Sequence, residues 1–221
     1  MATTAALDTP VSVLYDIPWD IYLSLRELPG NSHLRMTYHD GTLILVSPEY
    51  IHDRGGWLLN HVICEVANTF AIEVAGTGST TFRRKGHGNE KGDAKEPDEG
   101  FYIGANEALI RGKDTIDLEI DPPPDLAIEV DNKSDSTLTL PTYAGLLVPE
   151  LWRFDARKGT LWFGRLVEGA YQTIDRSLHL PMLTPDLVLF ALSKAADRGA
   201  TTWRLWLREW AGSLPGAIPR A

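Results

Sequence analysis

Residues 125–131 read DLAIEVD, an apolar run with acidic side chains at both ends and near its centre. The run predicts a strand buried on both faces, because a half-exposed strand would alternate apolar and polar residues. A carboxylate inside such a strand is costly unless a cation or hydrogen-bond donors compensate it, so Glu129 needs a partner. Side chains alternate along a strand, and Glu129 and Asp131 therefore project from the same side.

A second acidic segment lies earlier in the chain, where residues 96–99 read EPDE. If this segment begins a neighbouring strand, Asp98 joins Glu129 and Asp131 around one point. Oxygen ligands of this kind suit Mg²⁺, which keeps several waters in its coordination shell. The structural alternative is that Glu129 pairs with an arginine such as Arg153 and that Asp98 caps a turn. The residues by themselves leave both interpretations open.

Hydrophobic patterning predicts the elements on either side of these segments. An Asp40-Gly41 turn between two apolar runs indicates a hairpin over residues 35–46, and helical spacing predicts a long helix over 50–70. The other predicted elements are helices at 18–27 and 136–147 and strands at 79–84, 97–103, 126–130, 150–154, 160–165 and 171–174. The order helix, three strands, helix, strand across residues 50–155 indicates a mixed α/β core with helices on both faces of a sheet.

Composition limits the classes of function. With 221 residues, 43% hydrophobic and 23% charged, the chain is typical of a folded soluble protein, and its apolar runs are too short for a membrane helix. One cysteine excludes an internal disulfide, and the first thirty residues lack a secretory pattern, so we expect a cytoplasmic protein. The net charge of −9 disfavours nucleic-acid binding unless positive charge is concentrated locally.

Positive charge is concentrated just before the first carboxylate segment, beginning with Arg83, Arg84 and Lys85. A basic loop beside an acidic metal centre is what a phosphodiester substrate requires, and we predict that these residues bind substrate. A solvated loop is the alternative for a bare charge run. His52 falls on the inward stripe of the predicted long helix and could approach the carboxylates.

Several short motifs stand out along the chain: MTYHDG at 36–41, SP at 47–48 followed by His52, EPDE at 96–99, FYI at 101–103, PPPDLAIEVD at 122–131, YA at 143–144 and VPELWR at 148–153. Together they resemble the Uma-type family of bacterial restriction endonucleases, within the PD-(D/E)XK nuclease superfamily. The resemblance implies a restriction-endonuclease-like core of order αβββαβ, with an N-terminal hairpin and a C-terminal meander plus helix. It spans about residues 33–190, between an extension with a short helix at 1–32 and a C-terminal helix at 191–221.

The resemblance implies that Asp98 and Glu129 are metal ligands of an endonuclease that hydrolyses DNA with Mg²⁺, or with Mn²⁺ as a substitute. The superfamily usually has lysine two positions after the second acidic residue, where this chain has Asp131. Similar members place a lysine on the following helix, where this chain has Thr139. We predict that Lys133 replaces it.

His52 and Asp131 are expected to support the two metal ligands without being the main ligands themselves. A catalytically inactive member of the fold, acting as a nucleic-acid or protein interaction module, is the alternative that Thr139 and the net charge favour. A domain with no nucleic-acid role is a third possibility.

Association of two chains is also expected. Cutting both strands of a duplex with one centre per chain predicts a homodimer. The stripe Trp203, Trp206 and Trp210 recurs at helical spacing in the C-terminal segment. Packing of that helix on the body is the main interpretation, and a dimer surface is the other.

Overall fold

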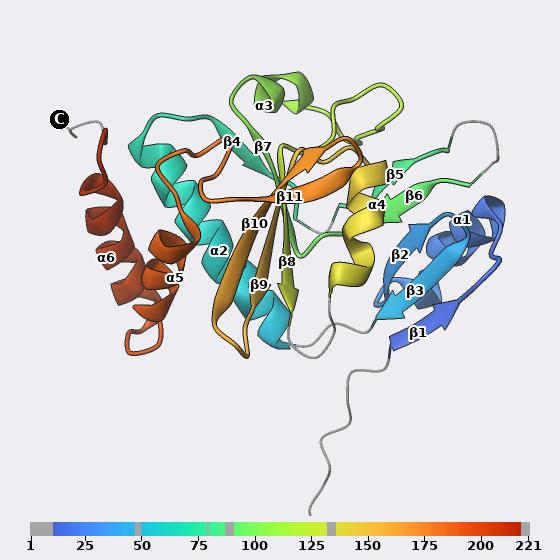
Figure 1. The fold of residues 1–221 in the computed structure, drawn as a ribbon, viewed down its shortest axis with the longest axis horizontal. Helices are drawn as coiled ribbons and strands as arrows, with labels where there is room; N and C mark the ends of the chain where they lie inside the picture. The colour runs from blue at the N-terminus through green and yellow to red at the C-terminus, as the bar shows by residue number, and fades with distance from the viewer. Residues whose placement is uncertain (1–10, 47–49, 79, 87–90, 132–135, 218–221) are drawn as a thin grey trace, which may run out of the picture.

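The computed structural model describes residues 11–46, 50–78, 80–86, 91–131 and 136–217, which form a mixed α/β fold containing two β-sheets (Figure 1). This confirms the mixed α/β class that the sequence predicted. The larger sheet has the strand order β11-β10-β9-β8-β7-β4. Its strands are β4 (Val74–Gly76), β7 (Glu99–Ile103), β8 (Leu126–Asp131), β9 (Glu150–Asp155), β10 (Thr160–Val167) and β11 (Ala170–Ile174).

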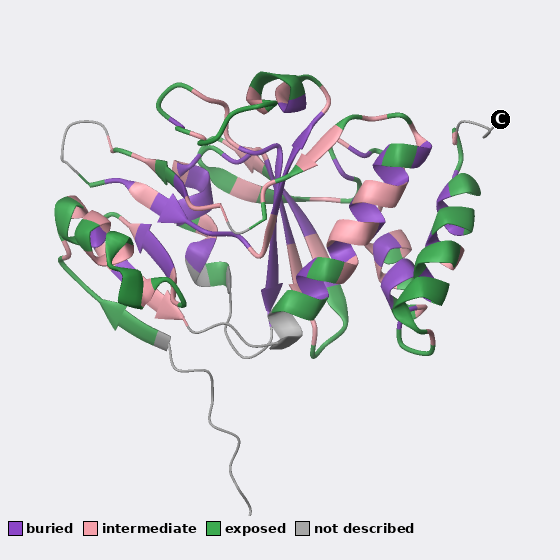
Figure 2. Cartoon of the chain, turned by 180° about the vertical axis from the view of Figure 1, so that it is seen from behind, coloured by how far each residue is buried: buried purple, intermediate pink, exposed green. Residues whose placement is uncertain are grey.

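Strand β8 is flanked by partners on both sides, and each of its residues is buried (Figure 2). It pairs antiparallel with β7 and parallel with β9. A parallel pair needs a crossover, which here consists of the 3-10 turn η2 (Ser136–Thr139) and helix α4 (Leu140–Gly145). With the long helix α2 (Tyr50–Thr69) at the start, the order α2, β4, β7, β8, α4, β9 has the predicted pattern of helix, three strands, helix and strand. Its first strand differs from the prediction, because the strand expected at 79–84 is β5 (Phe82–Arg84) of the smaller sheet and β4 takes its place.

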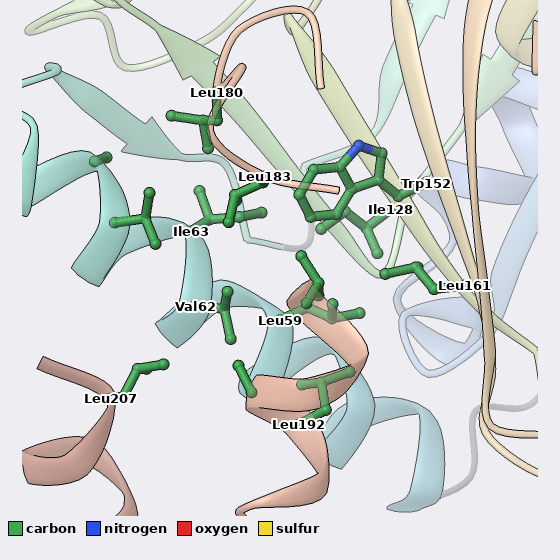
Figure 3. Packing of buried hydrophobic residues seen from close by; sticks show 14 of the residues in the cluster. Leu59, Val62, Ile63, Ile128, Trp152, Leu161, Leu180, Leu183, Leu192 and Leu207 are labelled. Carbon is green, nitrogen blue, oxygen red and sulfur yellow. The ribbon is translucent and has the colours of Figure 1, made fainter. Parts of the chain in front are cut away.

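Helix α2 covers one face of the larger sheet together with α5 (Pro185–Ser193), which contacts both α2 and β10, and α6 (Ala200–Gly212) packs on α2. The predicted apolar stripe of α2 is buried here, with Leu59 and Ile63 fully covered beside Ile128 of β8 (Figure 3). Burying an aliphatic side chain of this size contributes about 1.5–3 kcal/mol, so this layer is a main source of stability.

The tryptophan stripe of α6 faces this core. Trp203 is fully buried and its indole Nε1 donates a hydrogen bond to the Ala191 carbonyl oxygen at 3.0 Å. Trp210 is nearly buried, whereas Trp206 is half-buried and stacks on Trp210 with ring centroids 6.1 Å apart. Intramolecular packing therefore accounts for Trp203 and Trp210.

The smaller sheet has the order β1-β3-β2-β6-β5 and carries helix α1. The predicted hairpin is confirmed: β2 and β3 are antiparallel and joined by Asp40 and Gly41, which both have positive φ as a tight hairpin turn requires. Tyr22 of α1 packs on Tyr38 of β2 with ring centroids 5.0 Å apart. The elements are β1 (Val11–Leu14), α1 (Trp19–Glu27), β2 (Arg35–His39), β3 (Thr42–Val46), β5 (Phe82–Arg84) and β6 (Asp93–Lys95).

Helix α4 lies between the two sheets, because it contacts both β2 and β6 of the smaller sheet while its own side chains enter the core of the larger one. Tyr143 and Ala144 of α4 are buried. The contact with β6 is close: a Cβ atom on Gly145 would overlap the carboxylate of Asp93. Side chains from the two sheets therefore meet beside α4.

Some elements differ from the sequence-based predictions. Strands β1, β4 and β6 and helices α3 (Ala105–Ile110) and α5 were not predicted. The helix expected over 136–147 divides into η2 and α4, because Pro141 lacks the amide hydrogen that a continuous helix needs.

Candidate active site

Glu129 lies where β8, α4 and the smaller sheet meet. Its side chain is 9% exposed, and its Oε1 lies 3.2 Å from Nζ of Lys95 on β6. The hydroxyl of Tyr143 on α4 donates a hydrogen bond to the same oxygen. A buried carboxylate needs such compensation, and here it comes from two elements outside its own sheet.

Asp98 lies beside Glu129 at the start of β7. Its amide donates to the Ile128 carbonyl at 3.1 Å, and its Oδ2 accepts a hydrogen bond from the Val130 amide at 2.7 Å. Glu99 pairs with Ile128 across the strands, so continuing that antiparallel register by one residue sets Asp98 opposite Glu129. Residues directly opposite share a face, and this placement agrees with the sequence-based expectation.

A second cation holds Asp98. The guanidinium of Arg35 on β2 donates through Nη1 to Oδ1 of Asp98 and lies 3.6 Å, through Nη2, from the exposed carboxylate of Asp53 on α2. A neighbouring pair has the same chemistry, because Arg26 Nη2 lies 2.9 Å from Glu96 Oε2. The smaller sheet and α1 therefore supply the positive charge of the region.

Burial and neighbouring charges together shift the pKa values of these groups. Burial raises the pKa of Glu129, Lys95 lowers it, and Asp98 raises it further, with a net increase. Burial and the neighbouring Glu129 raise the pKa of the Tyr143 hydroxyl well above its usual range. For Arg35, burial would lower the pKa, but Asp98 and the other nearby carboxylates raise it overall, so its guanidinium stays charged.

Asp131 does not complete a cluster of three carboxylates. It projects from the same face as Glu129, but its Oδ2 lies 2.8 Å from Nη2 of Arg153. Over the described ranges, no three His, Cys, Asp or Glu side chains are grouped to hold an ion, which corrects the expected convergence on one point. The structural alternative, in which Glu129 pairs with an arginine such as Arg153, also differs in its partner, because the cation beside Glu129 is Lys95.

Two adjacent carboxylates nevertheless fit a Mg²⁺ ion. This ion is commonly bound by one or two carboxylates, with waters and substrate phosphates completing its shell. Asp98 and Glu129 provide the two carboxylates, and the hydrogen bond from the Val130 amide fixes the orientation of Asp98. The donor set therefore suits a hard cation shared with a phosphate substrate.

Lys95 was not recognised as a site residue from the sequence. It directly precedes the EPDE segment, but the short polar stretch Asp93-Ala94-Lys95 carries no local signal of a strand. Lys133 and the side chain of His52 lie outside the described residues. Thr139, where the lysine of similar proteins was expected, is buried at the end of η2.

The predicted substrate-binding residues lie at one edge of the smaller sheet. Arg83 and Arg84 belong to edge strand β5, and Lys85 follows it. Arg83 and Lys85 are exposed, and Arg84 is half-buried. Because Phe82 of β5 pairs with Lys95 of β6, this basic edge is one strand away from the lysine that contacts Glu129.

Comparison with known proteins gives one family. Residues 19–196 match the model of Uma2, described as "putative restriction endonuclease", so the match begins at α1 and includes Asp98 and Glu129. No curated protein matches the chain. Within the described residues, no helix has the length and apolar character needed to cross a membrane.

Proposed function

Because the chain belongs to the Uma2 family of restriction endonucleases, we propose that it is a Mg²⁺-dependent endonuclease that hydrolyses DNA phosphodiester bonds. Membership implies a restriction-endonuclease-like fold, with which the mixed α/β core accords. The observation that carries the proposal is the pair of buried carboxylates, Asp98 and Glu129, on adjacent strands beside Lys95. Two buried carboxylates on adjacent strands are costly, and the raised pKa of Glu129 is typical of a functional site.

Asp98 and Glu129 would hold Mg²⁺, which Mn²⁺ could replace. The bound ion would supply charge stabilisation at the phosphate and lower the pKa of a coordinated water. The Val130 amide keeps one oxygen of Asp98 in place, and the Tyr143 hydroxyl does the same for Glu129. These neutral donors hold the carboxylates in position without adding a competing charge.

Lys95 is the described cation best placed to act on the reacting groups. Its Nζ is 3.2 Å from Glu129, and its side chain is 8% exposed. From this position it would orient the attacking water or offset negative charge that develops on the phosphate. Lys133, predicted from the sequence for this role, remains the second candidate.

Arg83, Arg84 and Lys85 are proposed to contact the DNA backbone. Their place at an open sheet edge lets phosphates approach without disturbing the core. Local positive charge is needed because the chain as a whole carries −9. We also propose a homodimer, which light scattering at micromolar concentration would detect as twice the 24.5 kDa chain mass.

An inactive interaction module is the second candidate function. Thr139 stands where similar proteins carry lysine, and the net charge is negative. Such a protein would bind DNA or a protein partner but would not cut DNA under any metal condition.

Plasmid cleavage tests the proposal. The wild-type protein should nick or linearise supercoiled DNA in Mg²⁺ or Mn²⁺ but not in EDTA. Asp98→Asn and Lys95→Met should each lower the rate by about 10²-fold or more, since positioned charged groups typically contribute this much. Lys133→Ala decides between the two lysines.

Matched controls are Asp186→Asn and Lys194→Met, which change the same residue types on or just after α5. They should leave the cleavage rate unchanged. A wild-type protein that binds Mn²⁺ yet cuts no DNA would favour the interaction module, whereas one that binds neither metal nor DNA would contradict both functions.

A further inference from the structure

Arg35 forms an ion pair with Asp98, one of the two carboxylates that the proposed metal would use. Its Nη1 donates to Oδ1 of Asp98, while Oδ2 of the same carboxylate accepts from the Val130 amide. The backbone therefore holds one oxygen and the guanidinium holds the other. A cation that binds Asp98 through Oδ1 has to share this oxygen with Arg35 or displace it.

The site is charge-balanced by side chains from the smaller sheet. Arg35 on β2 neutralises Asp98, and Lys95 on β6 neutralises Glu129. The carboxylates are 7% and 9% exposed, so either would be strongly destabilising if left uncompensated. The structure thus contains internal counter-ions that allow the site to form before any divalent ion arrives.

A second partner lies next to the Arg35 guanidinium. Nη2 is 3.6 Å from Oδ1 of Asp53, whose side chain is 63% exposed. The Arg35 side chain is itself 19% exposed, so it borders solvent. A guanidinium presents several donors in a rigid fork and matches phosphate as well as carboxylate. It can therefore leave Asp98 without losing every charged contact.

We propose, resting on the proposed function, that Arg35 is an exchangeable counter-ion. In the metal-free protein, Arg35 pairs with Asp98. When a divalent cation binds Asp98, the Arg35 guanidinium leaves this carboxylate, stays next to Asp53 and contacts a phosphate of the DNA. Metal binding and DNA binding are thereby coupled through one side chain. Arg35 competes with the metal in the free protein and binds substrate in the loaded one.

Calorimetric titration of the DNA-free protein with Mn²⁺ measures the competition directly. Arg35→Met should bind Mn²⁺ about tenfold more tightly than wild type, because a positive charge next to the ligand oxygen is removed. Arg26→Met is the matched control: Arg26 is also 19% exposed and pairs with a buried glutamate, Glu96. Its Mn²⁺ affinity should stay within about twofold of wild type.

DNA binding measures the second half of the exchange. The duplex is short and Ca²⁺ is present, a hard cation with the same preference for oxygen. Under these conditions the slope of log Kd against log salt concentration should be smaller for Arg35→Met than for wild type, by about one phosphate contact. In EDTA the salt dependence of Arg35→Met and wild type should be equal, because Arg35 is then held by Asp98. A lower slope in both conditions would overturn the exchange, since it would mean that Arg35 contacts DNA regardless of metal.

Arg35→Lys keeps the inference testable if Arg35→Met does not fold. A lysine lacks the fork that reaches Asp98 and Asp53 together, so Mn²⁺ should bind several-fold more tightly than to wild type. If the Arg35 variant that folds binds Mn²⁺ no more tightly than wild type while wild type binds Mn²⁺ and cuts DNA, the exchange is wrong and the proposed function stands. If wild type binds no Mn²⁺, both fail.

Discussion

Glu129 and Glu150 are buried glutamates on neighbouring parallel strands, β8 and β9, yet their surroundings differ in kind. Glu150 lies on the α2 face and is held by neutral donors: the Trp152 indole at 2.6 Å, the Ser177 hydroxyl at 3.2 Å and the Leu178 amide at 2.9 Å. Glu129 lies on the α4 face and contacts a lysine from another sheet.

The difference separates a structural carboxylate from one suited to chemistry. The donors to Glu150 come from its own strand and an adjacent loop, and they cannot be exchanged for a substrate without opening the core. The Lys95 ammonium beside Glu129 carries a full charge and comes from the other sheet, so Glu129 is compensated by a group that could also act on a bound substrate. Burial alone therefore does not identify the site; the nature of the compensating groups does.

The largest expected effect is on cleavage. Glu129→Gln should reduce the rate of plasmid cleavage by about 10²-fold or more, because a neutral amide is a poor substitute for a carboxylate that binds a hard cation. Glu150→Gln keeps an acceptor for the Trp152 indole and should retain near wild-type activity. Equal losses in the two variants would contradict the distinction between the two glutamates.

Glu150 should matter more for the stability of the protein than for cleavage. Glu150→Ala leaves the buried donors of Trp152 and Leu178 without their acceptor, and we expect the free energy of unfolding to fall by about 2–4 kcal/mol. Ser177→Ala removes one hydroxyl that donates to Glu150 and accepts from the Leu180 amide, and it should cost about 1–2 kcal/mol. Urea denaturation in EDTA measures both. A loss below that of Ser177→Ala would mean that Glu150 is not a main support of this network.

Sequence reasoning located the elements whose evidence is local. The buried strand β8 and the apolar stripe of α2 could be predicted because the hydrophobicity of each residue indicates whether that residue is buried. The hairpin was visible because Asp40-Gly41 allows positive φ. Asp98 and Glu129 were proposed as site residues because acidic residues beside apolar strands are unusual, and the family resemblance implied their role as metal ligands.

The elements and contacts that were not predicted depend on contacts between distant segments of the chain. Strand β6 has three residues, two of them charged, and is a strand because it pairs with both β2 and β5. Lys95 therefore could not be assigned to Glu129 from sequence spacing. Helix α5 was missed for a related reason: it is apolar along most of its length and packs against α2 and β10, so it lacks an evident polar face.

The smallest expected effect is the contribution of Glu150 to the dependence of stability on pH. Burial raises the pKa of Glu150 above its usual 4.5, while hydrogen bonds from Trp152 and Ser177 oppose the increase. The folded protein thus binds this proton more tightly than the unfolded chain. The resulting stability is fully present below pH 4.5 and is lost as the pH rises through the folded-state pKa.

Glu150→Gln does not titrate, so its free energy of unfolding should fall less than that of wild type between acidic and neutral pH. Urea denaturation across this interval measures the two slopes, with Asp186→Asn on the surface as the control that keeps the wild-type slope. Identical slopes for wild type and Glu150→Gln would show that the neutral donors fully offset the burial of Glu150.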